Sequence, residues 1–114
     1  MQYLLLIHHD DDALAKAPPA LGAEYAAFNE ALAKSNVGTP GLRLEHASKA
    51  RSITRRTGTT EIIDGPYADT KDQFAGYMML DVPDIDTAVQ WAARCPSAKY
   101  GTIEIRPIWP MAGA

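Results

Sequence analysis

Residues 75–96 read AGYMMLDVPDIDTAVQWAARCP and contain a strand, a stop and a helix in succession. The run from Ala75 to Val82 is apolar and as short as a strand, and Pro83 ends it because proline has no N–H to donate to a strand ladder. Asp84 is the expected N-cap of a helix that Pro96 closes. The residues expected to form the buried stripe of this helix are Ile85, Ala88, Val89, Ala92 and Cys95.

Further strands and a helix flank this unit in both directions. Residues 102–108 alternate apolar and charged side chains, which predicts a final strand with one covered face. Residues 3–7 (YLLLI) form an unbroken apolar run, which predicts a central strand buried on both faces. Apolar residues spaced as on one face of a helix predict an amphipathic helix that ends near residues 35–38. These are Leu21, Tyr25, Phe28 and Leu32.

The middle of the chain predicts a twisted hairpin with charged edges. Side chains of two kinds alternate weakly over residues 42–46, where positions 43 and 45 are charged. Residues 52–56 and 59–63 flank a Thr57-Gly58 turn. Asp64-Gly65-Pro66 ends the hairpin, and Asp69 is an expected cap for one short helical turn. Arginines and a lysine gather here, and we interpret them as a solvated edge that resists aggregation.

This order of elements predicts one α+β domain over residues 1–114 with a ferredoxin-like β-α-β-β-α-β fold and an inserted hairpin. Both helices lie on one face of an antiparallel sheet in such a fold, so the other face is left open. On the last strand that face carries Glu104 and Arg106. A domain this small needs a partner to cover an apolar sheet face, and a second copy of the chain supplies one, so we expect a homodimer.

Composition excludes several classes of function. The net charge of −3 gives no broad positive field of the kind that nucleic-acid binding needs. The first residues lack the basic region of a signal peptide and are too few to cross a membrane. The single cysteine, Cys95, rules out an internal disulfide and fits a reducing compartment, so we expect a cytoplasmic protein.

Several motifs together resemble a known family. They are the strand YLLLI at residues 3–7, DGPYADTK at 64–71, the Gly76-Tyr77 pair, DVPD at 81–84 and GTIEIRP at 101–107. They resemble the YCII-related family in its DGPF-type branch, over nearly the whole chain. Tyr67 stands where that branch usually has phenylalanine. Tyr25 stands where shorter members have a histidine that works with an aspartate, so that dyad does not carry over.

The resemblance implies a ferredoxin-like fold in which two chains pack their open sheet faces together as a dimeric α+β barrel. The wider superfamily includes isomerases, lyases and monooxygenases of small molecules that act without a bound metal. Genes of the DGPF-type branch often lie beside those of extracytoplasmic-function sigma factors. A sigma-factor-related protein is therefore an implied partner.

Five side chains are candidates for a small-molecule site. His8 and Asp64 are the candidate acid–base groups, because histidine titrates near neutral pH and the Asp64 carboxylate can face a pocket. Tyr67, Lys71 and Arg106 are candidates for binding an anionic or aromatic ligand, Arg106 through a two-bond clamp on a carboxylate. Structural alternatives stay open: His8 is hydrogen-bonded or exposed, Asp64 fixes a turn, Tyr67 packs in the core, and Glu104 pairs with a neighbouring cation on the same sheet face.

The sequence gives no sign of a metal or cofactor. His8 and the adjacent residue His9 point to opposite faces of a regular strand and so cannot hold one metal together. No phosphate-cradling loop or nucleotide fingerprint is present. Three functions stay open: an enzyme or binder for a small anionic or aromatic metabolite, a non-catalytic regulatory protein in a sigma-factor context, and a cofactor-free oxygenase. Fold alone does not choose among them.

Overall fold

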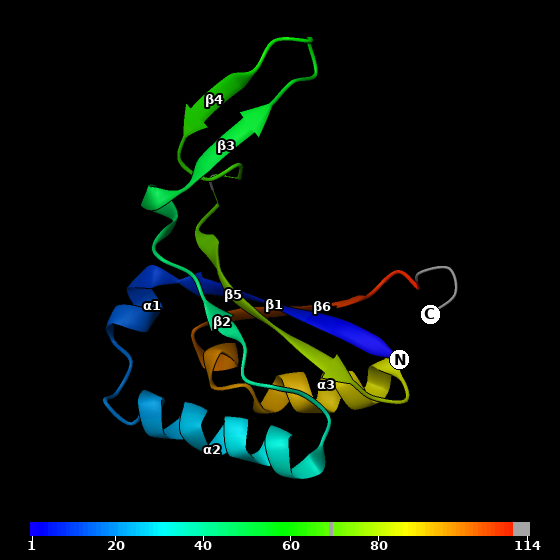
Figure 1. Ribbon diagram of the computed structural model, residues 1–114. Helices are drawn as coiled ribbons and strands as arrows, with labels where there is room; N and C mark the ends of the chain where they lie inside the picture. Colours follow the sequence, from blue (N-terminus) through cyan, green and yellow to red (C-terminus); the bar gives the residue numbers. More distant parts are fainter. Residues whose placement is uncertain (69, 111–114) are drawn as a thin grey trace.

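Four antiparallel strands form the central sheet of this computed structural model, which describes residues 1–68 and 70–110. Their order across the sheet is β2 (Leu42–Arg43), β5 (Asp72–Asp81), β1 (Gln2–Asp10) and β6 (Gly101–Pro107). Helix α2 (Leu21–Ser35) lies between β1 and β2 in the chain, and α3 (Ile85–Arg94) lies between β5 and β6 (Figure 1). The predicted α+β fold with β-α-β-β-α-β order is confirmed.

Both long helices cover the same face of the sheet, and the core lies between them and the central strands (Figure 1). Tyr3, Leu5 and Ile7 point into this core from β1 and are buried. Residues Leu4, Leu6 and His8 point the other way and are only half-buried, so the expectation of burial on both faces is wrong for the single chain. An unbroken apolar run fills both faces of a strand, but helices cover only one of them here.

Helix α3 begins as predicted but turns a different stripe to the core. Asp84 caps it by accepting a hydrogen bond from the backbone N–H of Thr87 at 2.8 Å. Ala88, Ala92 and Cys95 are buried as expected, but Ile85 and Val89 are 46% and 50% exposed. Trp91 takes their place beside the core, with its ring centroid 6.4 Å from that of Phe28. The stripe is shifted because the two rings fill the space between the helices.

Three short helical segments complete the body. Helix α1 (Asp11–Ala15) was not predicted, and its cap Asp10 accepts a hydrogen bond from the backbone N–H of Asp12 at 3.0 Å. The others are η1 (Ala47–Lys49) before the hairpin and η2 (Pro96–Lys99) before β6. Helix α2 ends where predicted, at Asn36 in the left-handed conformation. The cap expected at Asp69 lies outside the described residues.

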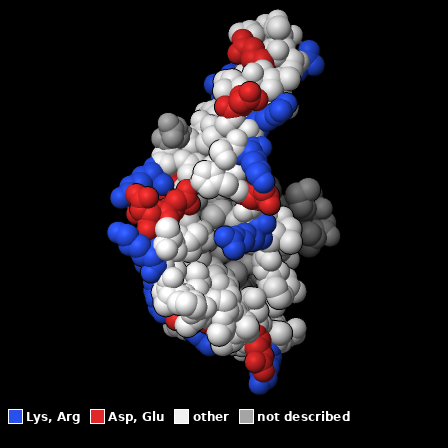
Figure 2. Space-filling view, turned by 90° about the vertical axis from the view of Figure 1, so that its left-hand side faces the viewer, with Lys and Arg blue, Asp and Glu red and all other residues white. Residues whose placement is uncertain are grey.

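The predicted hairpin forms an arm that projects from one end of the sheet (Figure 1). The arm is residues 51–64: β3 (Arg51–Thr54), β4 (Glu61–Asp64) and the turn between them. Its two strands pair only with each other among the described strands. Figure 2 shows basic and acidic side chains interspersed along it, as expected for a solvated edge.

The sheet surface opposite the two long helices, which we call the open face, is not covered by either of them (Figure 1). Strand register places side chains of three strands on it, because Leu4 pairs with Met79 and Arg106, Leu6 with Tyr77 and Glu104, and His8 with Phe74. Met79 is 43% exposed and Phe74 is 40% exposed. The open face is therefore apolar in its middle, with Glu104 and Arg106 at its β6 edge.

Candidate functional site

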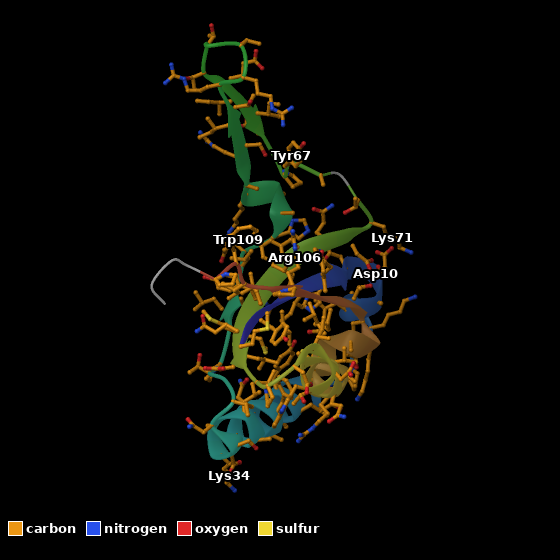
Figure 3. All side chains as sticks on the ribbon, turned by 90° about the vertical axis from the view of Figure 1, so that its right-hand side faces the viewer. Asp10, Lys34, Tyr67, Lys71, Arg106 and Trp109 are labelled. Carbon is orange, nitrogen blue, oxygen red and sulfur yellow. The ribbon has the colours of Figure 1, made fainter. Side chains whose placement is uncertain are left out.

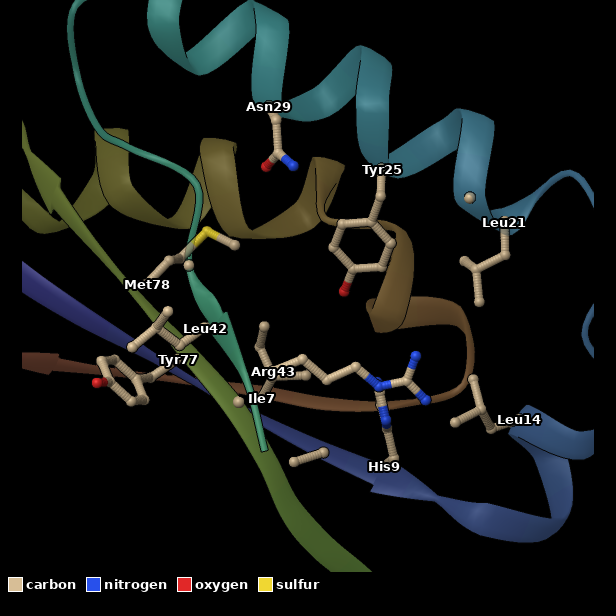
Figure 4. Close-up of a pocket in the computed structure, with 14 residues that line it drawn as sticks. Ile7, His9, Leu14, Leu21, Tyr25, Asn29, Leu42, Arg43, Tyr77 and Met78 are labelled. Atoms are coloured by element: carbon tan, nitrogen blue, oxygen red, sulfur yellow. The ribbon is translucent and has the colours of Figure 1, made fainter. Parts of the chain in front are cut away.

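A pocket of about 380 Å³ lies between helix α2 and the helix-covered face of the sheet (Figure 4). Its apolar wall includes Ile7, Leu14, Leu21 and Met78. Its polar lining includes His9, Tyr25, Asn29 and Arg43. Ligand sites of proteins have this size and character, with a mostly apolar wall and a few polar groups that orient the ligand.

The pleat of β1 brings His9 to this pocket. His9 follows Ile7 on the helix-covered side, and the strand pairing shifts between Ile7 and His8, where Ala75 of the partner strand is left over. A bulge of this kind bends the strand and redirects nearby side chains, and bulges are common beside functional sites. His8, one residue earlier, points to the open face instead.

Buried hydroxyl groups hold the His9 ring. Nε2 of His9 lies 2.7 Å from Oγ of Ser97, which is fully buried in η2. The Tyr25 hydroxyl bonds the same Ser97 oxygen and lies 3.5 Å from Sγ of Cys95. A histidine fixed through one ring nitrogen has a defined orientation and leaves the other nitrogen, Nδ1, for a ligand.

Burial and a neighbouring cation keep His9 neutral. Desolvation lowers the pKa of His9 below its ordinary value of 6.5, and the positive charge of Arg43 lowers it further, against weaker opposite effects of Asp11 and Asp72. Burial raises the pKa of the Tyr25 hydroxyl strongly, so this group stays protonated. Burial also raises the pKa of the Cys95 thiol, which therefore stays protonated at neutral pH.

A pH-dependent contribution of His9 to stability follows from this shift. Because the folded-state pKa lies below the unfolded value of about 6.5, the contribution is complete above that pH and is lost as the pH falls through the folded-state pKa. We expect the melting temperature of the wild type, minus that of His9→Gln, to decrease on acidification. A difference that grows on acidification would mean that His9 is charged in the folded protein.

Arg43 and Asn29 define what the pocket can recognise. Among its described lining residues none has a carboxylate, and Arg43 supplies a positive charge. Asn29 extends from α2 towards the pocket (Figure 4), and its buried Oδ1 has no hydrogen-bond partner among the described residues. A buried acceptor without a partner is unfavourable by about 1–3 kcal/mol, so a ligand that carries a donor relieves it.

The five side chains singled out from the sequence lie elsewhere, and the structure does not bring them into one pocket. His8 and Tyr67 line a second hollow of about 520 Å³ at the base of the arm. Nε2 of His8 lies 3.1 Å from a carboxylate oxygen of Glu104, and Tyr67 is 88% exposed. Their catalytic and binding roles stay predictions.

The other three candidates lie apart from one another, and Figure 3 labels two of them, Lys71 and Arg106. Asp64 lies on the arm, with its carboxylate 3.6 Å from Nε of Arg51. Nζ of Lys71 lies 3.4 Å from the carboxylate of Asp10. Arg106 is exposed at the edge of the open face. Asp64 and Lys71 thus have partners of opposite charge on nearby strands.

One signal in the sequence pointed to the pocket that we describe. Tyr25 lies in the apolar stripe of its helix, and a tyrosine hydroxyl that is brought into a core needs a polar partner. Ser97, His9 and Arg43 have no comparable signal, because they come from segments that only the folded chain brings together. Among residues 1–68 and 70–110, no group of three or more His, Cys, Asp or Glu is placed to hold a metal ion. In the same residues, every helix is too short or too polar to cross a membrane.

Comparisons with known proteins agree with the fold. The family model for the YCII-related domain matches residues 1–112. An uncharacterised protein of Rhizobium meliloti (strain 1021) is 32% identical over 71 residues, which is 60% of this chain and 57% of that protein. The chain therefore spans little more than half the length of that relative.

A solved structure is similar over almost the full length of both chains. It is the 5-chloro-2-hydroxyhydroquinone dehydrochlorinase of Burkholderia phenoliruptrix AC1100 in complex with 2,5-dihydroxybenzoquinone. The TM-score is 0.51 at 13% identity, and the similarity covers 98% of this chain and 97% of the other. Identity this low supports a common fold and nothing further.

Proposed function

The chain belongs to the YCII-related domain family, and we propose that it binds a small anionic or aromatic metabolite in the pocket beneath α2, where His9 acts as an acid–base group. The observation that carries this proposal is the pairing of a neutral His9 with the cation Arg43 in one pocket whose described lining has no carboxylate. Such a site attracts an acidic ligand and has a base ready to take its proton.

Proton transfer follows from the way the His9 ring is held. When Nε2–H of His9 donates to Ser97, Nδ1 is unprotonated and takes a proton from an acidic O–H or C–H of the ligand. The ligand becomes an anion, which Arg43 stabilises, and the imidazolium returns the proton to a second atom of the ligand or to a leaving group. Isomerases and lyases of small hydroxylated compounds work by such steps. The dehydrochlorinase that shares the fold was solved with 2,5-dihydroxybenzoquinone, so this quinone is a suitable probe to test here.

Asn29 further restricts the chemical class of ligand that fits the pocket. Its unpartnered Oδ1 favours a compound that has a hydroxyl group as well as an anionic group. Hydroxylated aromatic acids and acidic hydroxyquinones satisfy both requirements, and their rings match the apolar wall of the pocket.

A thermal-shift screen tests this function. The probes are benzoate, the three hydroxybenzoates and 2,5-dihydroxybenzoquinone. A ligand at about a hundred times its dissociation constant raises the free energy of unfolding by about 2.7 kcal/mol, which is a shift of several degrees. We expect Arg43→Ala to lose the shift and Arg106→Ala to keep it.

The matched arginine variants decide where the ligand binds. If Arg106→Ala and His8→Ala lose the shift while Arg43→Ala keeps it, the site is the one predicted from the sequence, on the open face. If no probe shifts the wild type, the small-molecule function is wrong for this class of compound.

We further propose that two chains pack their open faces together as a homodimer. Leu42, Phe74 and Met79 are exposed there at 61%, 40% and 43%, beside the half-buried Leu4 and Leu6. Contiguous apolar surface of this kind marks an interface, and a two-fold dimer covers both copies at once. The dimeric barrel implied by the family resemblance has this arrangement.

A non-catalytic regulatory protein is the second candidate function. It requires exposed apolar surface away from the dimer seam, and the arm provides some, because Ile53, Ile62 and Ile63 are all more than half exposed. The sigma-factor-related partner and the cytoplasmic location are parts of this second proposal. Co-purification of the chain with such a factor, lost when the isoleucines are replaced by serine, would favour it over the first.

A further inference from the structure

The chain exposes more surface than a self-contained domain of its mass. Its accessible surface is 8025 Å², whereas a compact monomer of 12.4 kDa has about 6,100 Å². Its radius of gyration is 16.1 Å, against about 13 Å for a compact chain of this length. The excess of roughly 1,900 Å² is as large as the total area that a standard protein interface buries. The chain therefore has the shape of one subunit of an assembly.

The arm exposes large apolar side chains. Ile53 faces Ile62 across the two strands, and these side chains are 66% and 60% exposed. A two-stranded hairpin is at best marginally stable in water without a surface to pack on. Exposed isoleucines on a short, open-edged pair of strands also promote aggregation unless something covers them. The arm thus needs an apolar surface that its own sheet does not supply.

The open face and the arm are continuous. The hollow at the base of the arm is lined by His8 and Phe74 from the open face and by Ser52 and Tyr67 from the arm side. A second chain that covers the open face would therefore also contact the arm. Figure 3 shows the arm and Tyr67 on one side of the sheet and helix α2, with Lys34, on the other.

Charge favours a second copy of this chain as the occupant. The arm has three arginines, at positions 51, 55 and 56, against Glu61 and Asp64, so its formal charge is +1. The whole chain carries −3, which leaves −4 on the remainder. An arm is therefore attracted to the body of another copy.

We propose that the arm of each subunit reaches across and packs its isoleucine face on the body of the second subunit. This inference rests on the open-face dimer proposed above and adds to it a second contact between the chains. The arm then serves as a clasp that holds the dimer, and Tyr67 at its base lies at the junction between the two chains.

Photo-crosslinking from the arm tests the clasp. The only natural cysteine, Cys95, is buried, so a cysteine placed on the surface is labelled selectively by benzophenone maleimide. The test variant is Ile53→Cys, and the matched control is Lys34→Cys, at the exposed end of α2. After irradiation we expect a covalent dimer on a denaturing gel from Ile53→Cys and none from Lys34→Cys.

The mass of each unirradiated variant, from light scattering, separates the two proposals. A labelled Ile53→Cys protein that is dimeric but gives cross-links only within one chain overturns the clasp and leaves the open-face dimer intact. A chain that is monomeric at micromolar concentration overturns both. Equal dimer cross-linking from the control variant would also count against the clasp, because it would show contacts with no preferred site.

Discussion

Replacing Gly101 with alanine is expected to destabilise the chain strongly. Gly101 lies in β6 opposite His9 of β1. A methyl group there would lie 1.9 Å from the carbonyl oxygen of His8 and 2.9 Å from Cα of His9. Both obstacles are backbone atoms of a central strand, so the strands must separate. We expect a loss of about 3 kcal/mol or more in the free energy of unfolding, from a total of about 5–15 kcal/mol.

Urea denaturation followed by circular dichroism measures this loss, and Gly22→Ala is the matched control. Gly22 lies in helix α2, and an added methyl group would have nothing within 4 Å. Alanine is favoured over glycine inside a helix by about 0.5–1 kcal/mol, so the control should be slightly more stable than the wild type. If the free energy of unfolding of Gly101→Ala were within about 1 kcal/mol of the wild-type value, which is the size of a single hydrogen bond, β1 and β6 would not pair in this register.

The fold could be predicted because its signals are local. Pro83 and Asp84 mark the change from strand to helix whatever surrounds them, and the structure has β5 end at Asp81 and α3 begin at Ile85. The Thr57-Gly58 turn is equally local, and Gly58 has the positive φ of 85° that glycine tolerates. Alternation along residues 102–108 likewise required no knowledge of the partner strand.

The exposed faces of elements were harder to predict, because they depend on what packs nearby. In α3 the helical spacing of the apolar residues Ile85 and Val89 is compatible with a buried stripe. Trp91 packs beside the core instead, because its ring contacts the ring of Phe28 on the other helix. The guanidinium carbon Cζ of Arg94 lies over the Trp91 ring, 4.4 Å from its centroid. Such contacts between residues far apart in sequence leave no periodic trace.

The site shows the same limit most clearly in the two histidines. The sequence shows that His8 and His9 point to opposite faces of one strand. It does not show which face the helices cover, because residues 3–7 are apolar on both. The structure places His9 under α2 and His8 on the open face. An unbroken apolar run therefore conceals the side on which a pocket forms, whereas an alternating run reveals it.

Replacing Met79 with glutamate is expected to convert the proposed dimer into a monomer. Met79 is in the middle of the open face, paired across β5 and β1 with Leu4, and is 43% exposed in the single chain. In a dimer that covers this face, a carboxylate here loses its water without gaining a partner. Burial of an unpaired charge is unfavourable by several kcal/mol, which lowers the affinity of the subunits by about a thousandfold.

Light scattering over a range of concentrations measures this change, and Val89→Glu is the matched control. Val89 has a similar exposure of 50% but lies on α3, on the opposite side of the sheet. It should keep the wild-type mass. The unfolding transition of the Met79→Glu monomer should remain cooperative, because the residue is not part of the buried core. If Val89→Glu becomes monomeric and Met79→Glu stays a dimer, the chains associate through their helices, and the open face must be covered in another way.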